Sequence, residues 1–257
     1  PVRITWNGHV ETFDAGSLAH IQINTTGSGG HTISVLHDLA GPQVDLQLAG
    51  PGTATDVFQY QSTTLVNSLS LQGVQNFAVV TLQGKEIFYS LSAGHVLQQF
   101  VGGTWATVAS NVKSFQVANW LYHVPFAFYL TNDGRLFEAS DGITFNLWKT
   151  GIQKFAVGDF SATYPELGDF NFLFALDQNG VLTRSDGSTI DGSSDPVVAI
   201  GVTDFQLAHW YGRNFLFYAT TSGAIYSAQD GLNPIFQGAG LYRSASGKWN
   251  PMAGCWG

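Results

Sequence analysis

One pattern recurs along the chain at intervals of about 40 residues, the spacing typical of repeat architectures. Each copy holds a short strand-like segment with a bulky apolar residue at the same place. These anchor residues are Ile33, Phe77, Phe115, Phe155 and Phe205, at spacings of 44, 38, 40 and 50 residues. Because the copies follow one another through most of the chain, we expect similar structural units in series.

Each copy also predicts four short strands joined by tight turns. In the copy anchored at Phe115, the second strand covers 126–130 and ends at Asn132-Asp133-Gly134, and the third covers 135–138 and ends before Asp141-Gly142. Gly, Asn-Gly and Asp-Gly supply the positive φ angles that tight hairpins need. Four antiparallel strands in about 40 residues are typical of a β-propeller blade.

The sequence therefore predicts an all-β fold with a single β-propeller domain over residues 1–257 and four-stranded antiparallel blades. Dividing the length by six gives about 43 residues per blade, so we predict six blades, with five as the alternative. Residues 9–16 align with 95–102, and residues 241–249 read as one or two further strands. We expect strands from both termini to close the ring.

Composition excludes several classes of partner. Charged residues make up 11% of the chain, against about 25% in ordinary domains, and the formal net charge is −8. The chain has no basic surface for nucleic acid and no apolar run long enough for membrane insertion. Its one cysteine, Cys255, excludes an intrachain disulfide and cysteine-rich zinc sites. Few lysines and many Ser, Thr and Gly residues favour an extracellular or secreted protein.

A polar residue stands four positions after every anchor, where the inner strand leaves the channel. These residues are His37, Thr81, Asn119, Asp159 and His209. Unlike polar side chains at equivalent positions suggest one ligand at the axis. His37, Asn119, Asp159 and His209 offer nitrogen and oxygen ligands for a single divalent metal ion, and the alternative is that the ring binds channel water. The candidates for acid–base catalysis are His37, Asp159 and His209.

The loops after the inner strands are rich in aromatic residues. The predicted ligand-binding residues are Trp120, Tyr122, His123, Tyr164, Glu166, Trp210, Tyr211 and Arg213. Aromatic faces with a few polar groups are how sites hold sugars and planar ligands. The alternative is that Trp120, Phe160 and Trp210 pack between blades as core.

The repeats resemble those of tectonin-type propellers, which are six-bladed lectins. The resemblance is carried by 151–158 and by 241–254, with Trp105, Trp148 and Trp249 as the tryptophans of that pattern. It implies carbohydrate binding, with a glycan or small-molecule partner and no catalysis. Two alternatives stay open: a metal-dependent hydrolase, lactonase or lyase at the channel mouth, and a protein-interaction module of a larger extracellular protein.

Overall fold

The computed structural model describes residues 2–6, 9–13, 20–26, 32–35, 43–49, 57–60, 69–72, 74–82, 85–120, 124–160, 171–187, 195–210, 213–229 and 231–239. Before Val74 it describes backbone pairing alone. Every regular element within these ranges is a β-strand, as the sequence predicts. None of the described segments is a helix with the length and hydropathy of a membrane span.

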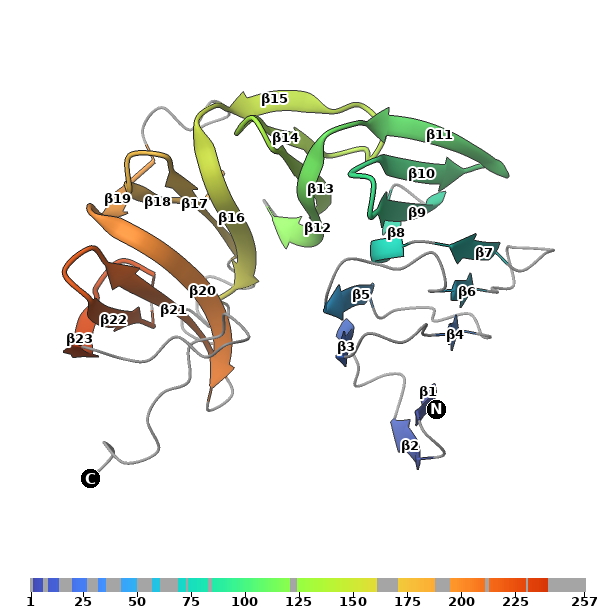
Figure 1. The fold of residues 1–257 in the computed structure, drawn as a ribbon, viewed down its shortest axis with the longest axis horizontal. Helices are drawn as coiled ribbons and strands as arrows, with labels where there is room; N and C mark the ends of the chain where they lie inside the picture. The colour runs from blue at the N-terminus through green and yellow to red at the C-terminus, as the bar shows by residue number, and fades with distance from the viewer. Residues whose placement is uncertain are drawn as a thin grey trace. The chain divides into compact units, whose positions relative to one another are not determined.

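Four successive groups of four strands carry the repeat (Figure 1). The first group is β8 (Val74–Leu82), β9 (Lys85–Ser92), β10 (Leu97–Val101) and β11 (Thr104–Ala109). The second is β12 (Val112–Trp120), β13 (Val124–Thr131), β14 (Leu136–Ala139) and β15 (Asn146–Lys149). The third is β16 (Ile152–Asp159), β17 (Asn171–Asp177), β18 (Leu182–Ser185) and β19 (Val197–Ala199). The fourth is β20 (Val202–Trp210), β21 (Arg213–Thr220), β22 (Ala224–Ala228) and β23 (Ile235–Ala239).

Within each group the strands lie side by side in chain order, and neighbours pair antiparallel, as β9 does with β10, β17 with β18 and β21 with β22. This arrangement confirms the predicted all-β propeller fold and its four-stranded blades, and we call each group a blade. The anchors Phe77, Phe115, Phe155 and Phe205 sit in the inner strands β8, β12, β16 and β20, with exposed fractions of 0%, 6%, 8% and 0%. The residue that recurs in each sequence repeat is therefore a core residue of each blade.

In the first three blades, a polar side chain at the first position closes the hairpin between the second and third strands. The hydroxyl of Ser92 accepts the N–H of Val96, and the carboxylate of Asp177 accepts the N–H of Val181. Thr131 does the same for Arg135, at 3.0 Å. Three chemically different residues thus perform one structural task, because each places an acceptor opposite the backbone N–H four residues on.

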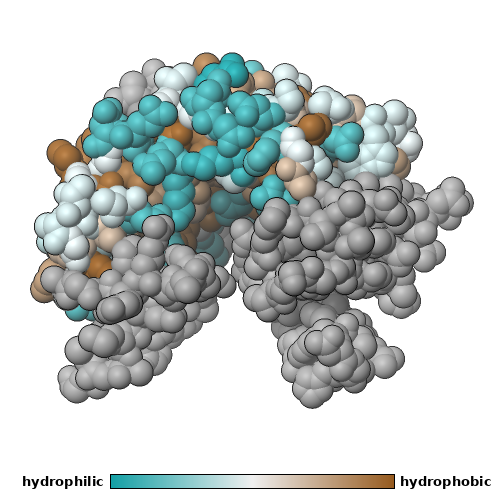
Figure 2. Space-filling view, in the orientation of Figure 1, coloured by the Kyte–Doolittle hydropathy of each residue, from teal (hydrophilic) through white to brown (hydrophobic). Residues whose placement is uncertain are grey.

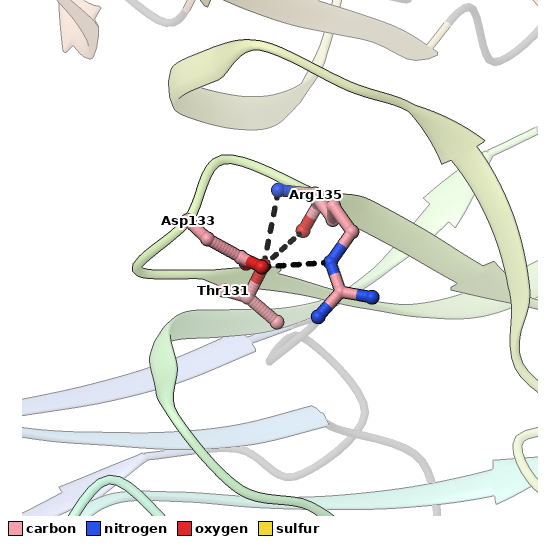
Figure 3. Close-up of polar contacts among 3 residues, drawn as sticks. All are labelled: Thr131, Asp133 and Arg135. Carbon is pink, nitrogen blue, oxygen red and sulfur yellow. Dashed lines mark hydrogen bonds and ion pairs between the residues drawn. The ribbon is translucent and has the colours of Figure 1, made fainter.

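Figure 3 shows the fullest version of this hairpin, built from Thr131, Asp133 and Arg135. The Thr131 hydroxyl also donates to the Asp133 carboxylate, whose second oxygen lies 2.9 Å from Arg135 Nε. The hydrogen bond from Thr131 and the nearby Arg135 charge lower the pKa of Asp133. Asp133 and Arg135 are half-exposed, and their contacts serve the turn.

The chain before Val74 is arranged differently from the later blades. It contains β1 (Val2–Trp6), β2 (His9–Phe13), β3 (His20–Thr26), β4 (Thr32–Val35), β5 (Gln43–Ala49), β6 (Val57–Tyr60) and β7 (Leu69–Gln72). Two pairs are parallel, β3 with β5 and β4 with β6. The prediction of a four-stranded antiparallel unit around Ile33 is wrong in this respect. Residues 36–56 contain no Asn-Gly or Asp-Gly pair, and parallel strands use long connections instead of tight turns.

The terminal strands and the domain count are less fully described. β2, which contains His9, pairs with β1 in a two-stranded sheet. Residues 241–249 lie outside the described residues. The chain forms two compact units: residues 1–117 with 140–144, and residues 118–139 with 145–257. A single domain, six blades and closure by both termini stay predictions.

The second unit contains two aromatic clusters that fix its blades. One gathers Trp120, Phe126, Phe128 and Trp148 with Phe155 of the next inner strand. The other repeats this arrangement one blade further on; it gathers Phe160, Phe172, Phe174, Phe205 and Tyr218. Burying such large rings between successive sheets supplies the main stabilisation of the unit.

Candidate functional site

The predicted ring of polar residues is described in part. Asn119 and Asp159 occupy the same place in β12 and β16, seven residues after the first residue of each strand, and both are exposed. His209 holds the equivalent place in β20, where only its backbone is described. His37 lies outside the described residues. Of the four proposed metal ligands, the structure therefore describes the side chains of two, Asn119 and Asp159, at equivalent strand ends.

The backbone beside Asp159 contributes to contact between blades. The side-chain amide of Asn214 in β21 donates to the main-chain carbonyl of Asp159, and Asn214 pairs across the sheet with His209. This rim is therefore held by a polar contact that needs no ligand. Within the described residues, no group of three or more His, Cys, Asp or Glu side chains is close enough to hold a metal ion. The channel metal stays a prediction.

Trp120, which the sequence assigns to the ligand-binding loops, is a core residue in the structure. Its side chain is 2% exposed, and its ring centroid lies 5.2 Å from that of Phe126 and 5.4 Å from that of Phe128. Phe160 takes the same place after β16 and is 0% exposed, 5.6 Å from Phe174. Both residues therefore pack as core residues, which is the alternative to ligand binding that the sequence left open. Trp120 presents no ring face to a ligand.

The rest of the predicted ligand-binding set is not described at the level of side chains. Trp210 and Arg213 belong to β20 and β21, where their backbones alone are described. Outside the described residues lie Tyr122, His123, Tyr164, Glu166 and Tyr211. Binding of a glycan there, catalysis by His37, Asp159 or His209, and the extracellular location stay predictions.

The structure draws attention to a surface that the sequence analysis did not identify: the outermost strands of the second unit's blades. β15, β19 and β23 are each the last strand of their sheet, at the opposite end from the first strands β12, β16 and β20 (Figure 1). Large apolar side chains on these strands are exposed: Leu147 is 52% exposed, Val197 54%, Ile235 65% and Phe236 57%. Just after β19, Ile200 is 73% exposed.

Charge is scarce on the same strands. Their sequences are Asn146–Lys149, Val197–Ala199 and Ile235–Ala239, so Lys149 carries their one charge. Its Nζ lies 2.6 Å from the carboxylate of Asp195, which is 3% exposed, and 4.5 Å from the ring centroid of Trp148. The Lys149 ammonium group is therefore paired with Asp195 and Trp148. In the face shown in Figure 2, brown hydrophobic residues are scattered among teal and white ones.

We call Leu147, Val197, Ile235 and Phe236 the outer-strand residues. A sequence signal for them exists in hindsight. A short strand at the edge of a sheet usually alternates apolar with polar residues or carries charges, and β19 and the start of β23 do neither.

Comparisons with known proteins add little beyond this geometry. No family model and no curated protein matches the sequence. Among solved structures, a crystal structure of BBS1N in complex with ARL6DN, soaked with lead, matches with a TM-score of 0.41 and 10% identity, over 61% of this chain and 53% of that chain. A second crystal of the same complex, soaked with mercury, matches with a TM-score of 0.34 and 10% identity, over 61% of this chain and 63% of that one. Likenesses this distant carry no argument about ligand or partner.

Proposed function

We propose that the protein is a β-propeller interaction module that binds other proteins through the outer strands of its blades. The observation that carries this proposal is the exposure of the outer-strand residues, between 52% and 65%, on strands that end their sheets. Of the three functions that the sequence left open, this is the protein-interaction module.

The chemistry of a sheet edge explains why such strands bind. An outermost strand offers a row of backbone N–H and C=O groups to an extended segment of another chain, which can add itself as a further strand. Natural proteins usually protect such edges with charged residues. Here the one charged residue, Lys149, is paired with Asp195, so the edge keeps its apolar character. Side chains such as Leu147 and Phe236 would then supply affinity beyond the backbone hydrogen bonds.

The test uses the full chain and a phage-displayed library of linear peptides of strand length, about 5–10 residues. We expect enriched peptides to be apolar and extended, and Leu147→Asp or Phe236→Asp to weaken their binding at least about tenfold, or 1.4 kcal/mol. Val124→Asp is the matched control, because Val124 is also exposed, at 41%, but begins the second strand of its blade.

A glycan array screened with the same preparations separates this proposal from the lectin prediction. Equal peptide binding by the two outer-strand variants and the control would refute the proposal. So would a glycan ligand found together with no enriched peptide.

A further inference from the structure

Strand register places one residue of each outermost strand at an equivalent position, directly before a β-bulge. The residues at this position are Thr107, Leu147, Val197 and Phe236, and one unpaired residue follows each of them. Phe236 is the aromatic one of the four, and it is 57% exposed. The β20–β23 blade therefore presents a ring to solvent where the other blades present smaller side chains.

The Phe236 ring is the outer end of a row of aromatic side chains. Across the sheet, Phe205 pairs with Tyr218, Tyr218 with Tyr226, and Tyr226 with Phe236. The rings of Tyr218 and Tyr226 stack at 5.2 Å, and those of Tyr226 and Phe236 lie 5.6 Å apart. Tyr218 is 4% exposed. The exposed ring is thus supported by buried ones, which lowers the cost of ordering it when a partner binds.

Elsewhere in the described chain, cations of the protein itself lie over ring faces. In the β12–β15 blade, Cζ of Arg135 lies 5.8 Å from the ring centroid of Phe137, which is the cross-strand partner of Leu147. In the next blade, Cζ of Arg184 lies 4.0 Å from the ring centroid of Phe172. The negative face of an aromatic ring attracts such cations.

Among the described residues, no lysine or arginine lies over the ring of Tyr226 or Phe236. The residue of this blade equivalent to Arg135 is Ala224, because each directly precedes the last pair on the far side of the bulge. Residues 214–239 contain no lysine or arginine at all, and the formal net charge of the chain is −8. An open ring face in an acidic protein is complementary to a cation supplied by another chain.

The other two outermost strands of the second unit suit a cationic partner less well. β15 ends in Lys149, and Arg135 lies at the start of the neighbouring strand, so both would repel a partner's positive charge. β19 is three residues long and follows Pro196, which has no backbone N–H to offer. β23 is five residues long and carries no charge. Of the three strands, β23 is therefore the best docking edge for a basic segment.

Side chains have to supply much of the selectivity at this edge. Gln237 is the unpaired residue of the bulge, and its amide donates to the Ser227 hydroxyl at 2.8 Å and to the Ile235 carbonyl at 3.4 Å. A bulge interrupts the regular row of backbone groups that an added strand would use. What remains is the pair Ile235 and Phe236, whose side chains point to opposite faces of the sheet because successive strand residues alternate.

We propose that the edge of β23 binds an extended segment in which basic and apolar residues alternate. An arginine side chain of the segment lies on the Phe236 ring, and an apolar side chain packs against Ile235. Arginine is preferred to lysine because the planar guanidinium group stacks on aromatic rings. This inference rests on the proposed interaction through the outer strands and adds the chemistry of the partner.

The first experiment measures the binding of two synthetic hexapeptides to the full chain by titration calorimetry. One peptide alternates arginine with valine; the other has citrulline, the uncharged isostere, in place of each arginine. We expect the arginine peptide to bind at least about tenfold more tightly at low ionic strength, with the preference shrinking as salt is added. Ile235→Ala is the matched control: it should weaken both peptides alike and leave their ratio unchanged.

The second experiment changes the electronic character of the ring and keeps its shape. Phenylalanine analogues that carry increasing numbers of ring fluorine atoms have a progressively weaker negative face. Placed at Phe236, they should lower the affinity for the arginine peptide stepwise, by about threefold or more in total, and leave the citrulline peptide unaffected. An affinity for the arginine peptide that does not change with fluorination would overturn the assignment of Phe236 as the cation's site.

The outcomes also separate this inference from the proposed function. Equal binding of the two hexapeptides, weakened by Phe236→Asp, would refute the cationic partner and leave the interaction module standing. So would binding of neither hexapeptide while the phage library still yields peptides that Phe236→Asp weakens. Binding of neither hexapeptide and no enriched library peptide would refute both.

Discussion

Gly231 should be one of the least replaceable residues of the chain, for two reasons that the structure separates. Its φ is +70°, a conformation that costs an L-residue about 1–2 kcal/mol. In addition, a Cβ at this place would lie 2.6 Å from Cζ and 3.0 Å from Cε1 of Phe174. The Phe174 ring is 0% exposed, so it has little room to move away. Forcing extra volume into such a core typically costs about 1–3 kcal/mol.

We therefore expect Gly231→Ala to lower the free energy of unfolding by about 2–5 kcal/mol, the sum of the two terms. Gly151→Ala is the control, because Gly151 has nearly the same φ, +72°, but no atom within 4 Å of the added Cβ. Its loss should be the first term alone, about 1–2 kcal/mol. Urea unfolding followed by tryptophan fluorescence measures both, provided the slope m is unchanged.

A third variant tests the contact itself. Phe174→Leu shortens the side chain that the new methyl group would strike, so Gly231→Ala should cost less in the Phe174→Leu background than in the wild type, by about 1 kcal/mol or more. Equal losses for Gly231→Ala and Gly151→Ala, with simple additivity in the double variant, would show that the ring yields freely and that the packing argument is wrong.

Three further changes give equally definite expectations. Trp120→Ala should lower the free energy of unfolding by about 3–5 kcal/mol, and Trp120→Phe by much less; an Ala variant with unchanged thermal unfolding would refute the core assignment. Tyr89 donates to the carbonyl of Gly142, and burial raises the pKa of Tyr89. The folded chain therefore favours the neutral phenol of Tyr89. Tyr89 contributes fully to the free energy of unfolding below pH 10, the ordinary tyrosine pKa, and this contribution is lost as the pH rises above 10. Tyr89→Phe should cost about 1 kcal/mol at neutral pH and flatten the alkaline decline in urea midpoints; a decline as steep as in the wild type would contradict this. Metal analysis beside His209→Ala tests the channel ion: a stoichiometric metal lost in the variant supports it, and a metal-free wild type refutes it.

The sequence predicts the later blades well because their signals are local. Phe115, Phe155 and Phe205 recur at the same place in each copy, and Gly-containing turns separate the strands. Each blade is built from neighbouring strands, so residues close in sequence determine its pairing. The parallel pairs β3 with β5 and β4 with β6 have no such local signal, because the connections between parallel strands can take many forms.

The sequence is less informative about which side of a strand end faces solvent. Trp120 stands at the end of β12 beside an irregular loop, and its type alone fits either a ligand site or a core. What decides the matter is the second strand, where Phe126 and Phe128 present two rings to it, and the fourth, where Trp148 presents another, 5.9 Å away. That decision depends on contacts between strands of the sheet, which the sequence around Trp120 does not contain.

The hairpin residues bear on the polar ring at the strand ends. Ser92, Thr131 and Asp177 differ in charge and size, yet each accepts the same backbone N–H. Unlike polar residues at equivalent positions are therefore no sign of a shared ligand in this fold. The same reasoning applies to Asn119 and Asp159. The strand end at Asp159 is already held in part by the hydrogen bond from the Asn214 amide to the Asp159 carbonyl.

A ligand at this ring would have to act through side chains, whereas the observed bond uses the backbone of Asp159. Asp159→Asn keeps the backbone and the size of the side chain but removes the charge. If the ring is structural, this change should leave thermal unfolding and any bound metal unchanged. Asn214→Ala should instead destabilise the chain by about 1 kcal/mol, because it removes the hydrogen bond between the blades. The opposite pattern, an inert Asn214→Ala and an Asp159→Asn that loses a bound ion, would restore the ligand interpretation of the ring.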